Sequence, residues 1–591
     1  AAVFDIETTG LDRFAEDAQV NTLVIGTHNT QWVIPLKLRK SPWKKYSKQL
    51  QILQWVQEAL DECPETIAQN GKFDNLYMQV HYGLKFKLTF DTMLAKSLLD
   101  ENTPSGLKWN VVNLLKRPDY DIDMDTKQGK GNLKKHKKYA SYDGLYEFLL
   151  WWRYKNDLEE DLVLNRVFRE MVMPVARAYE EIEAVGVYMD MPKYEKAKEE
   201  IQDRIVELEA ELIEYADINW GSTKQIGNYL YNDLGIKPVG YTPKGAPSTA
   251  EACLKRHLTN DDHPCITSLM ELRGHKQNNS FYINGWADRT VNECWLYPKY
   301  KINGAVTGRP SCEDPNLQQT PRLPLIRSIV GAPEGWTAFE ADYSQIELRV
   351  MAEMSGEREM MRIFNSGGDI HEETYKSFAG ISIDEAVAHI KDPDKRKAQK
   401  KEERKKAKAI NFGFIYGMGW STFVKYAFNK YDMVITPRES KNFRKSFFEK
   451  YPDLLDYHDK QRRIVRSQGY VRTLSGRIRH LPNVWSPIEW EQAEAERQAI
   501  NSPVQGLGAE MTLMALPELV ILEPDNIVVC GTIHDASLGR VRNGYEELLH
   551  EVRAIMENSK IMRKLGIKLT VPILVDIELG NWSIGDEFPR R

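Results

Sequence analysis

Residues 404–417 read RKKAKAINFGFIYG. Within them Arg404, Lys408, Phe412 and Tyr416 recur every four residues. Four residues overshoot one helical turn by only about 40°, so all four side chains are expected on one broad face of a helix. Such a face suits a nucleotide, because phosphates pair with cations and the base and sugar pack against rings. Alternatively, the two cations belong to a solvated basic helix surface and the two aromatic residues to a stripe that packs in the core.

Two acidic residues flank this helix in the sequence. Asp342 ends the strand-like segment TAFEADYS and leads into the helical segment QIELRVMAEMSG, whereas Asp535 lies at the tip of a predicted β-hairpin, 526–542. Carboxylates on rigid strands can bind two Mg²⁺ ions, of which one lowers the pKa of a 3′-hydroxyl and the other neutralises a triphosphate. Each aspartate alone is explained equally well as a turn residue, but together with the helix they favour a metal-dependent nucleotide site.

A second group of acids lies near the N-terminus. Asp5 and Glu7 alternate in the apolar segment AAVFDIETTG, so a strand would place both on one face. Asp74 follows in NGKFD, and Asp143 ends the segment YASYD that begins with Tyr139. Four acids and a tyrosine can form a phosphodiesterase site with two metal ions about 3.5–4 Å apart. A lone Asp-x-Glu is typical of a surface strand end, but the two later motifs within one domain-sized segment favour a site.

The order of hydrophobic patterns predicts several domains. Roughly the first 150 residues alternate strands, such as NTLVIGTH, with helices, such as QLQILQWVQEALDE, which is an α/β pattern. Helical patterns dominate 155–215, 265–290 and 345–480, and a Pro/Gly-containing loop is expected at 235–248. Strands are expected at 293–306 and 336–343.

Composition excludes some classes of protein. The 591 residues are 42% hydrophobic and have a mean hydropathy of −0.51, and the chain contains no run of about 18 apolar residues, so a membrane protein is not expected. None of the six cysteines lies in a Cys-x-x-Cys motif, which opposes a zinc site and a disulfide framework. The net charge of −5 hides a basic segment, 395–408, with nine Lys or Arg against two Glu.

Several segments together resemble family A DNA polymerases, the group of bacterial DNA polymerase I and many phage replicases. DYSQIELR (342–349) resembles motif A of that family, RKKAKAINFGFIYG resembles motif B, and IHD (533–535) resembles motif C. Further similarity lies in TGRPSCEDPNLQQTP (307–321), RQAINSPVQG (497–506) and the thumb-like GSTKQIGNYLYNDLGI (221–236). The resemblance extends from about residue 170 to the C-terminus.

This resemblance implies a role for each matching residue. Asp342, Asp535 and the backbone carbonyl of Tyr343 would bind the metal ions, and Lys408 would also protonate pyrophosphate. The residues implied to contact the nucleotide are Arg404, Lys408, His371 in GGDIHEET, Phe412, Tyr416 and Glu347, which would crowd a 2′-hydroxyl. The residues implied to contact primer and template are Arg309, Arg497, Asn501 and Gln505.

The N-terminal motifs resemble those of DnaQ-like 3′→5′ exonucleases. DIETTG, NGKFD and Tyr-x3-Asp follow in the order seen in proofreading domains, and FDTMLAKSLLD (90–100) resembles a segment between the last two. The resemblance implies that Asp5, Glu7, Asp74 and Asp143 hold two Mg²⁺ or Mn²⁺ ions. It also implies that Tyr139 orients the attacking water.

The expected fold is a multidomain α/β protein in which an RNase H-like exonuclease domain (1–160) precedes a right-hand polymerase domain (161–591). The palm is expected at about 165–190, 293–355 and 485–591, the thumb at about 190–292 and the fingers at about 356–484. Two positions depart from common family patterns. Ala536 stands where motif C usually has Glu, and Phe412 stands where some relatives have Tyr, which implies discrimination against dideoxynucleotides.

The expected function is proofreading, template-directed DNA synthesis in replication, with primer–template DNA and dNTPs as partners. A palm-type RNA polymerase is opposed by Glu347, and a nuclease-only protein or an inactive DNA-binding scaffold by the complete set of candidate residues. Reverse transcription stays open as a side activity. The family's 5′-nuclease region does not precede these motifs here, which favours a phage-type or organelle replicase over a repair enzyme. We therefore expect a monomer in the cytoplasm or nucleoid of a bacterial host, or in an organelle, and no secretion; its replisome partners are undefined.

Overall fold

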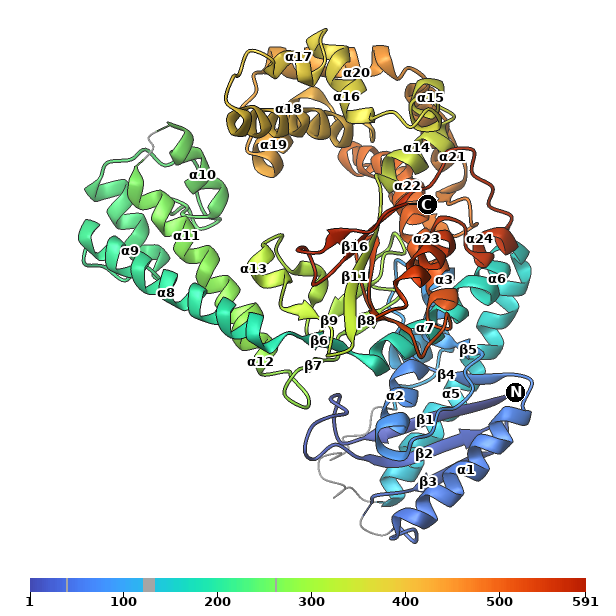
Figure 1. The fold of residues 1–591 in the computed structure, drawn as a ribbon. Coiled ribbons are helices and arrows are strands. Elements are labelled where there is room, and N and C mark those ends of the chain that lie inside the picture. Colours follow the sequence, from blue (N-terminus) through green and yellow to red (C-terminus); the bar gives the residue numbers. More distant parts are fainter. Residues whose placement is uncertain (39–40, 121–132, 261–262, 591) are drawn as a thin grey trace.

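The computed structural model describes residues 1–38, 41–120, 133–260 and 263–590. Figure 1 shows the N-terminal region at the bottom, a helical arm at the left, a helical layer at the top and a central sheet between them. None of the helices in the described ranges is long and apolar enough to cross a membrane.

The N-terminal region is a mixed sheet covered by helices. Its strands have the order β3-β2-β1-β4-β5, in which β2 is antiparallel to β1 and β3, and β4 is parallel to β1 and β5. The strand bounds are β1 Ala2–Thr8, β2 Val20–Gly26, β3 Gln31–Pro35, β4 Thr66–Ala68 and β5 Phe90–Asp91. The helix bounds are α1 Tyr46–Glu62, α2 Gly71–Tyr82, α3 Thr92–Leu99, α4 Leu107–Asn113 and α5 Leu133–Glu160. The expected RNase H-like arrangement is confirmed.

The central sheet carries the two expected metal-binding aspartates. Its strand order is β14-β15-β11-β16-β17, and all of its pairs are antiparallel. The bounds are β11 Trp336–Tyr343, β14 Ile527–Ile533, β15 Ala536–Arg542, β16 Val575–Leu579 and β17 Asp586–Glu587. The helices α7 (Met173–Val185) and α22 (Glu489–Leu519) pack against each other beside this sheet. The predicted 526–542 hairpin is therefore confirmed.

A short strand interrupts the predicted helical segment 155–215. This strand is β6 (Val187–Met189), and it pairs with β7 (Trp295–Leu296) and β10 (Val330–Gly331) in a separate sheet. Gly186, with a φ of 66°, ends α7 just before it. Helical periodicity hid the strand because it is only three residues long and the next helix, α8 (Met191–Tyr215), begins two residues after its end.

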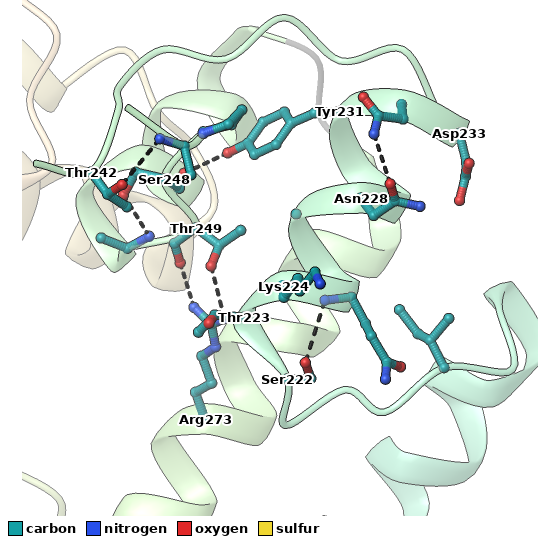
Figure 2. Close-up of a pocket in the computed structure, with 17 residues that line it drawn as sticks. Ser222, Thr223, Lys224, Asn228, Tyr231, Asp233, Thr242, Ser248, Thr249 and Arg273 are labelled. Carbon is teal, nitrogen blue, oxygen red and sulfur yellow. Dashed lines mark hydrogen bonds between the residues drawn. The ribbon is translucent and has the colours of Figure 1, made fainter. Parts of the chain in front are cut away.

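The helical arm has a hydrophobic core of its own. The helices α8, α9 (Thr223–Asn228), α10 (Glu251–Asn260) and α11 (Pro264–Asn278) surround buried residues that include Leu212, Trp220 and Leu269. Near the tip of the arm lies a groove of about 1040 Å³, lined largely by hydroxyl and amide side chains together with Lys224 and Arg273 (Figure 2). This arm covers the range expected for the thumb, and the thumb boundaries stay predictions.

The helical layer at the top of Figure 1 covers the range expected for the fingers. Its helices are α15 Arg358–Asn365, α16 Ile370–Ala379, α17 Ile383–Val387, α18 Pro393–Phe414, α19 Trp420–Tyr431, α20 Pro437–Lys450 and α21 Asp453–Gln468. The predicted helix between the two aspartates is therefore α18, although it ends earlier than the sequence pattern indicated. A short hairpin, β12 (Tyr470–Arg472) and β13 (Ile478–His480), follows α21.

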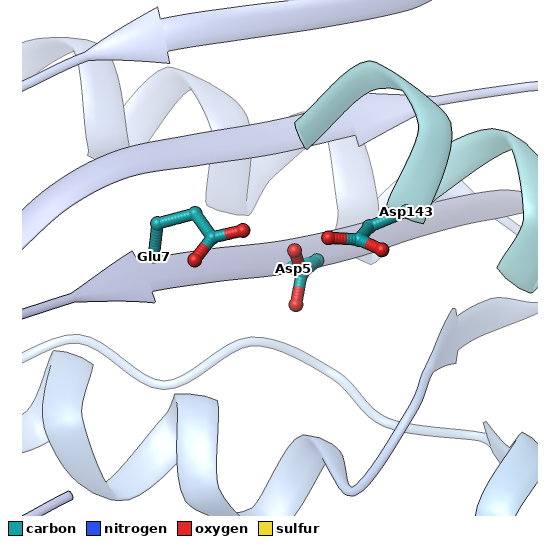
Figure 3. Close-up of side chains that lie close together, drawn as sticks. All are labelled: Asp5, Glu7 and Asp143. Carbon is teal, nitrogen blue, oxygen red and sulfur yellow. The ribbon is translucent and has the colours of Figure 1, made fainter. Parts of the chain in front are cut away.

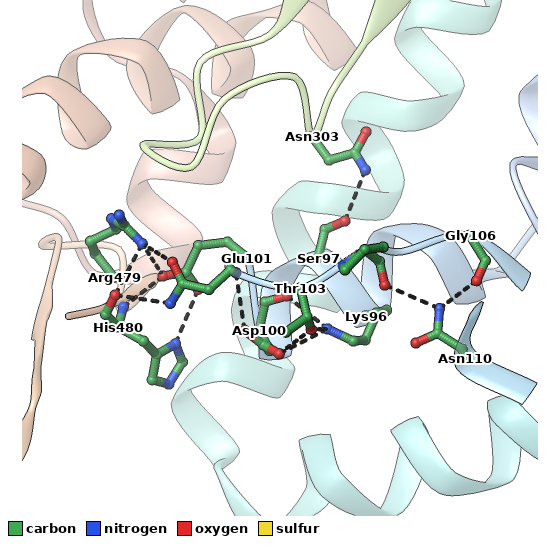
Figure 4. Close-up of polar contacts among 12 residues, drawn as sticks. Lys96, Ser97, Asp100, Glu101, Thr103, Gly106, Asn110, Asn303, Arg479 and His480 are labelled. Atoms are coloured by element: carbon green, nitrogen blue, oxygen red, sulfur yellow. Dashed lines mark hydrogen bonds and ion pairs between the residues drawn. The ribbon is translucent and has the colours of Figure 1, made fainter. Parts of the chain in front are cut away.

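Polar contacts join this hairpin to the N-terminal region (Figure 4). The Glu101 carboxylate, which follows α3, accepts hydrogen bonds from Arg479 Nη1 at 2.8 Å and from the backbone N–H of His480 at 2.6 Å. A second contact lies nearby, where Asn303 Nδ2 donates to Ser97 Oγ at 2.8 Å. The N-terminal region thus packs directly against the rest of the chain.

Candidate active sites

Two neighbouring strands place Asp342 beside Asp535. Asp342 pairs across the strands with Ala536, and Asp535 immediately precedes Ala536 in the two-residue loop between β14 and β15. His534, the first loop residue, has a φ of 53°, a left-handed value that two-residue hairpin loops require at this position. The side chains predicted to share a metal site therefore lie together at one end of two neighbouring strands in the central sheet.

The surroundings of both carboxylates favour a bound cation. Asp342 opens into a cleft, but the surrounding protein, together with Glu340 and Asp535, raises its pKa to about 7. Burial also raises the pKa of Asp535, against the opposing effect of Arg309. Asp535 Oδ1 is buried and has no hydrogen-bond partner among the described residues. Because hard oxygen ligands suit Mg²⁺ and Mn²⁺, the donor set fits such ions.

The cleft beside these strand ends has a volume of about 570 Å³ and collects most of the predicted nucleotide-contacting residues. Helix α18 contributes three of them and α16 contributes one. The predicted residues that line the cleft are Asp342, Tyr343, Glu347, His371, Arg404, Lys408, Phe412 and Asp535. Residues separated by nearly 200 positions in sequence thus meet in one cavity.

Electrostatics within the cleft follow from burial and from neighbouring cations. Arg404 forms an ion pair with Asp369, whose carboxylate also accepts a hydrogen bond from the backbone N–H of His371 at 2.9 Å. Burial together with Arg404 lowers the pKa of Lys408. Burial, Arg404 and Lys408 lower the pKa of His371 to about 3, so this ring is neutral at physiological pH.

Tyr416 lies just outside the helix that its spacing predicted. Helix α18 ends at Phe414, and Gly417 with a φ of 77° turns the chain two residues after Ile415. Helix α18 therefore includes Arg404, Lys408 and Phe412, whereas Tyr416 lies in the turn that follows it. The tyrosine does not line the cleft itself, but its hydroxyl donates to the cleft residue Glu347, which also forms an ion pair with Arg309.

The other residues implied to contact primer and template lie on α22 and do not line the cleft. Arg497, Asn501 and Gln505 are spaced by four residues, so they share one side of this helix. Arg497 forms an ion pair with Glu494, and Asn501 Oδ1 is buried without a hydrogen-bond partner among the described residues. Their predicted role is compatible with a neighbouring ligand but stays a prediction.

Sequence reasoning missed three residues that line the same cleft: Arg322, Lys430 and Tyr431. Arg322 directly follows the 307–321 segment, so a basic residue there was visible beside a recognised motif. Lys430 and Tyr431 end α19 and had no distinguishing pattern. Asp369 was also missed, although it caps the helix that carries His371.

The N-terminal carboxylates meet at a second site. Asp5 and Glu7 from β1 and Asp143 from α5 have carboxylate oxygens that all lie within 4.8 Å of one another (Figure 3). Burial and the charge of Asp143 raise the pKa of Asp5, and burial, Asp5 and Asp143 raise that of Glu7. Such mutual repulsion is relieved by a divalent cation, and the all-oxygen donor set suits Mg²⁺ or Mn²⁺.

The remaining predicted residues of this site surround the trio. Asp74 is buried and accepts a hydrogen bond from the Ile6 backbone N–H at 2.9 Å, so it braces β1 and is not one of the three grouped acids. Tyr139 lies one helical turn before Asp143 on α5. Sequence reasoning missed Lys108, whose Nζ lies 2.6 Å from Asp143 Oδ1 and 4.0 Å from the Tyr139 ring centroid.

Two protein-family models match the two parts of the chain. The DNA polymerase family A model matches residues 191–583, and a 3′-5′ exonuclease model matches residues 2–159. The first range holds all of the predicted cleft residues, and the second holds Asp5, Glu7, Asp74, Tyr139 and Asp143.

Similar proteins point to the same family. The chain is 32% identical over 426 residues to the thermostable DNA polymerase I of Thermus filiformis, covering 70% of this chain and 48% of the relative. It is 32% identical over 451 residues to that of Thermus aquaticus, covering 74% and 50%. It is 27% identical over 608 residues to DNA polymerase I of Pseudomonas aeruginosa, covering 98% and 63%. The chain thus spans about half to two thirds of the length of these curated relatives.

A solved structure has the same fold. It is described as the POL domain of Pol1 from M. smegmatis in complex with DNA primer-template and dNTP, and it superposes with a TM-score of 0.81 at 23% identity. The match covers 98% of this chain and 95% of the solved chain. With one family model matching about two thirds of its length, this chain belongs to DNA polymerase family A and carries a 3′-5′ exonuclease domain at its N-terminal end.

Proposed function

We propose that this chain extends a DNA primer on a DNA template with dNTPs and removes mispaired 3′ ends with its exonuclease domain. The observation that carries this proposal is the cleft that Asp342 and Asp535 line together with Arg404 and Lys408. Carboxylates and cations that line one cavity suit a triphosphate bound through metal ions. Relatives named DNA polymerase I support the same conclusion.

Each cleft residue has a distinct part in the proposed synthesis. Two Mg²⁺ ions at Asp342, Asp535 and the Tyr343 carbonyl would supply Lewis acidity for the 3′-hydroxyl and charge neutralisation for the triphosphate. Arg404 binds the triphosphate in an orientation that Asp369 fixes. Lys408, whose pKa is lowered by burial and by Arg404, is suited to pass a proton from Nζ to the departing pyrophosphate. Phe412 and Tyr416 border the sugar and the insertion site.

In the proposed exonuclease reaction the N-terminal acids would hold divalent cations that supply Lewis acidity at the scissile phosphate. The grouped carboxylates of Asp5, Glu7 and Asp143 support their role as direct ligands, and Asp74, which contacts β1, would complete the set. Tyr139 orients the attacking water through its hydroxyl. Lys108 neutralises Asp143 in the protein free of ligands.

Primer extension on matched and 3′-mismatched templates with Mg²⁺ tests both activities. Asp535→Ala should abolish extension and keep excision of the mismatch. Asp5→Ala combined with Glu7→Ala should keep extension of the matched primer and abolish excision. Glu16→Ala, an exposed acid in the same domain, is the matched control. Extension by the Asp535 variant or excision by the double variant would contradict the corresponding assignment.

We further propose that the protein acts in replication. A proofreading site fused to a synthesis site suits accurate copying of long templates more than short gap filling. The six cysteines are all free, which suits the reducing cytoplasm or nucleoid of a bacterial host, or an organelle. We expect the chain to act as a monomer. Because it must copy any sequence, it should bind DNA mainly through phosphates, so its affinity for DNA should fall steeply with salt.

A further inference from the structure

A buried chain of hydrogen bonds runs beneath the nucleotide cleft. Thr374 Oγ1 on α16 lies 2.9 Å from Tyr451 Oη, just after α20, and donates to Asn411 Oδ1 on α18 at 2.8 Å. Asn411 Nδ2 lies 2.8 Å from His371 Nδ1. All four side chains are at most 1% exposed, so water does not compete for these bonds. The chain ends on the predicted phosphate-contacting histidine.

The donors in this chain fix its direction. An amide nitrogen can only donate, so His371 Nδ1 must accept the hydrogen bond from Asn411. The single hydroxyl proton of Thr374 is used on Asn411 Oδ1, which leaves Tyr451 to donate to Thr374 Oγ1. A neutral imidazole carries one proton, and with Nδ1 accepting, that proton must be on Nε2.

The other face of the ring belongs to the cleft. His371 lines the cavity together with Arg404 and Lys408. Its Nε2 makes no hydrogen bond to the part of the chain that the structure describes. A neutral N–H directed at phosphate oxygens adds a directional contact beside the two cations without adding a third positive charge. The opposite tautomer would instead present a lone pair to those oxygens and repel them.

We propose that Asn411 is a positioning residue that holds His371 as the Nε2–H tautomer, so that His371 donates a hydrogen bond to the triphosphate of the incoming dNTP. Only the second half of this proposal, the hydrogen bond from His371 to the triphosphate, rests on the polymerase function proposed above. The tautomer itself is a property of the protein without nucleotide. The two halves can therefore be tested separately.

Histidine-selective ¹⁵N labelling and long-range ¹H–¹⁵N correlation spectra test the tautomer without any activity measurement. The signal of His371 among the twelve histidines is assigned by its loss in His371→Gln. We expect the Nε2–H tautomer in the wild type and a mixture of tautomers in Asn411→Leu. Asn411→Asp is a second, isosteric variant, and at a pH at which its carboxylate is ionised it can only accept, so the ring must then carry a proton on Nδ1. A proton on Nδ1 in the wild type, or no change in either variant, would overturn the proposal.

Steady-state incorporation kinetics test the consequence. Hydrogen bonds to charged groups are strong enough that Asn411→Leu should raise the KM for dNTP about tenfold or more, with a smaller change in kcat. In a His371→Ala background the same substitution should leave KM unchanged, because the residue acts through the ring. An equal rise in both backgrounds would show a merely structural role and contradict the proposal.

Two controls separate this proposal from loss of folding and from failure of the polymerase function. Asn442→Leu on the exposed side of α20 should leave the KM unchanged. Circular dichroism spectra and thermal melting of the whole protein report whether the Asn411 variants are folded. A wild type without nucleotide incorporation would refute the proposed function while the tautomer result stands on its own.

Discussion

The Tyr416 hydroxyl donates a hydrogen bond to Glu347 Oε2 at 2.8 Å, so the second residue after the end of α18 is tied to the first turn of α14 (Ile346–Ser355). Arg309 pairs with the other oxygen of the same carboxylate. Glu347 is therefore held from two sides and cannot easily swing away from the cleft. A fixed carboxylate beside the proposed sugar position is a steric and electrostatic obstacle to a 2′-hydroxyl.

Replacing Glu347 with alanine should relax discrimination against ribonucleotides. Removing the obstacle opens room for a 2′-hydroxyl, and we expect ribonucleotide incorporation relative to dNTP to rise about a hundredfold, which corresponds to about 2.7 kcal/mol. Single-turnover incorporation of rATP and dATP opposite thymine measures the ratio. Glu347→Gln, which keeps the volume of the side chain, is the matched control and should retain most of the discrimination. An unchanged ratio in Glu347→Ala would place the sugar elsewhere in the cleft.

Phe412→Tyr should increase incorporation of dideoxynucleotides. Phe412 lines the cleft one helical turn beyond Lys408, where a phenol hydroxyl would lie beside the sugar and replace the missing 3′-hydroxyl. Competition between ddNTP and dNTP in primer extension measures the effect, and we expect a rise of at least tenfold. The Asp5→Ala and Glu7→Ala substitutions should be present in both proteins so that excision does not hide incorporation. Equal discrimination with and without the hydroxyl would contradict this placement of the ring.

The sequence predicted features that repeat within one element. Asp5 and Glu7 alternate along a strand, and Arg404, Lys408 and Phe412 recur along a helix, so short-range geometry alone placed each group on one face. The same spacing predicted that the helix would include Tyr416. It ends earlier because a left-handed glycine, and not hydrophobic periodicity, sets the end of α18. The strand β6 was missed because three residues are too short for a periodic signal.

Contacts between distant elements could not be predicted in this way. The ion pair of Arg404 with Asp369 joins α18 to the N-cap of α16, and the bond of Asn411 to His371 joins the same helices. Lys108 reaches Asp143 from α4. These partners depend on how elements pack in three dimensions, and nothing in the local spacing of either partner marks it.

Divalent cations should stabilise the protein more at pH 8 than at pH 5.5. The raised pKa values of Asp342 and of the N-terminal acids mean that the folded protein without metal binds more protons than the unfolded chain between about pH 4 and 7. The stability of the metal-free protein therefore falls as the pH rises through this window. Cations compete with these protons, so their contribution grows over the same range.

Melting temperatures in EDTA and in excess Mg²⁺ measure this effect. At a concentration a hundred times its Kd, one bound ion stabilises the fold by about 2.7 kcal/mol. The increase in melting temperature caused by Mg²⁺ at pH 8 should shrink in a protein that carries Asp5→Asn, Glu7→Gln, Asp342→Asn and Asp535→Asn, because these amides remove the charges but keep the shapes of the side chains. An equal Mg²⁺ effect at both pH values, or in the substituted protein, would contradict the two proposed metal sites.

Glu101→Gln should loosen the N-terminal domain from the rest of the chain. The Glu101 side chain is 9% exposed and bonds Arg479, which is 14% exposed, and His480. Burial alone would raise the pKa of Glu101, but His480 and Arg479 lower it overall. The ion pair therefore contributes stability above the ordinary carboxyl pKa of about 4.3, and this contribution is lost as the pH falls below it.

The uncharged amide of Gln keeps the shape of the side chain but leaves Arg479 without its ion pair. This loss should lower the free energy of unfolding by about 3 kcal/mol. Differential scanning calorimetry at pH 7 should show a lower first transition, and limited proteolysis should release the exonuclease domain faster. Glu313→Gln is the matched control, because its pair with Lys301 is 51% and 54% exposed and should contribute less than about 1 kcal/mol. Lowering the pH to 3.5 should reduce the difference between wild type and Glu101→Gln. Identical melting of the two proteins at pH 7 would show that this contact does not join the domains.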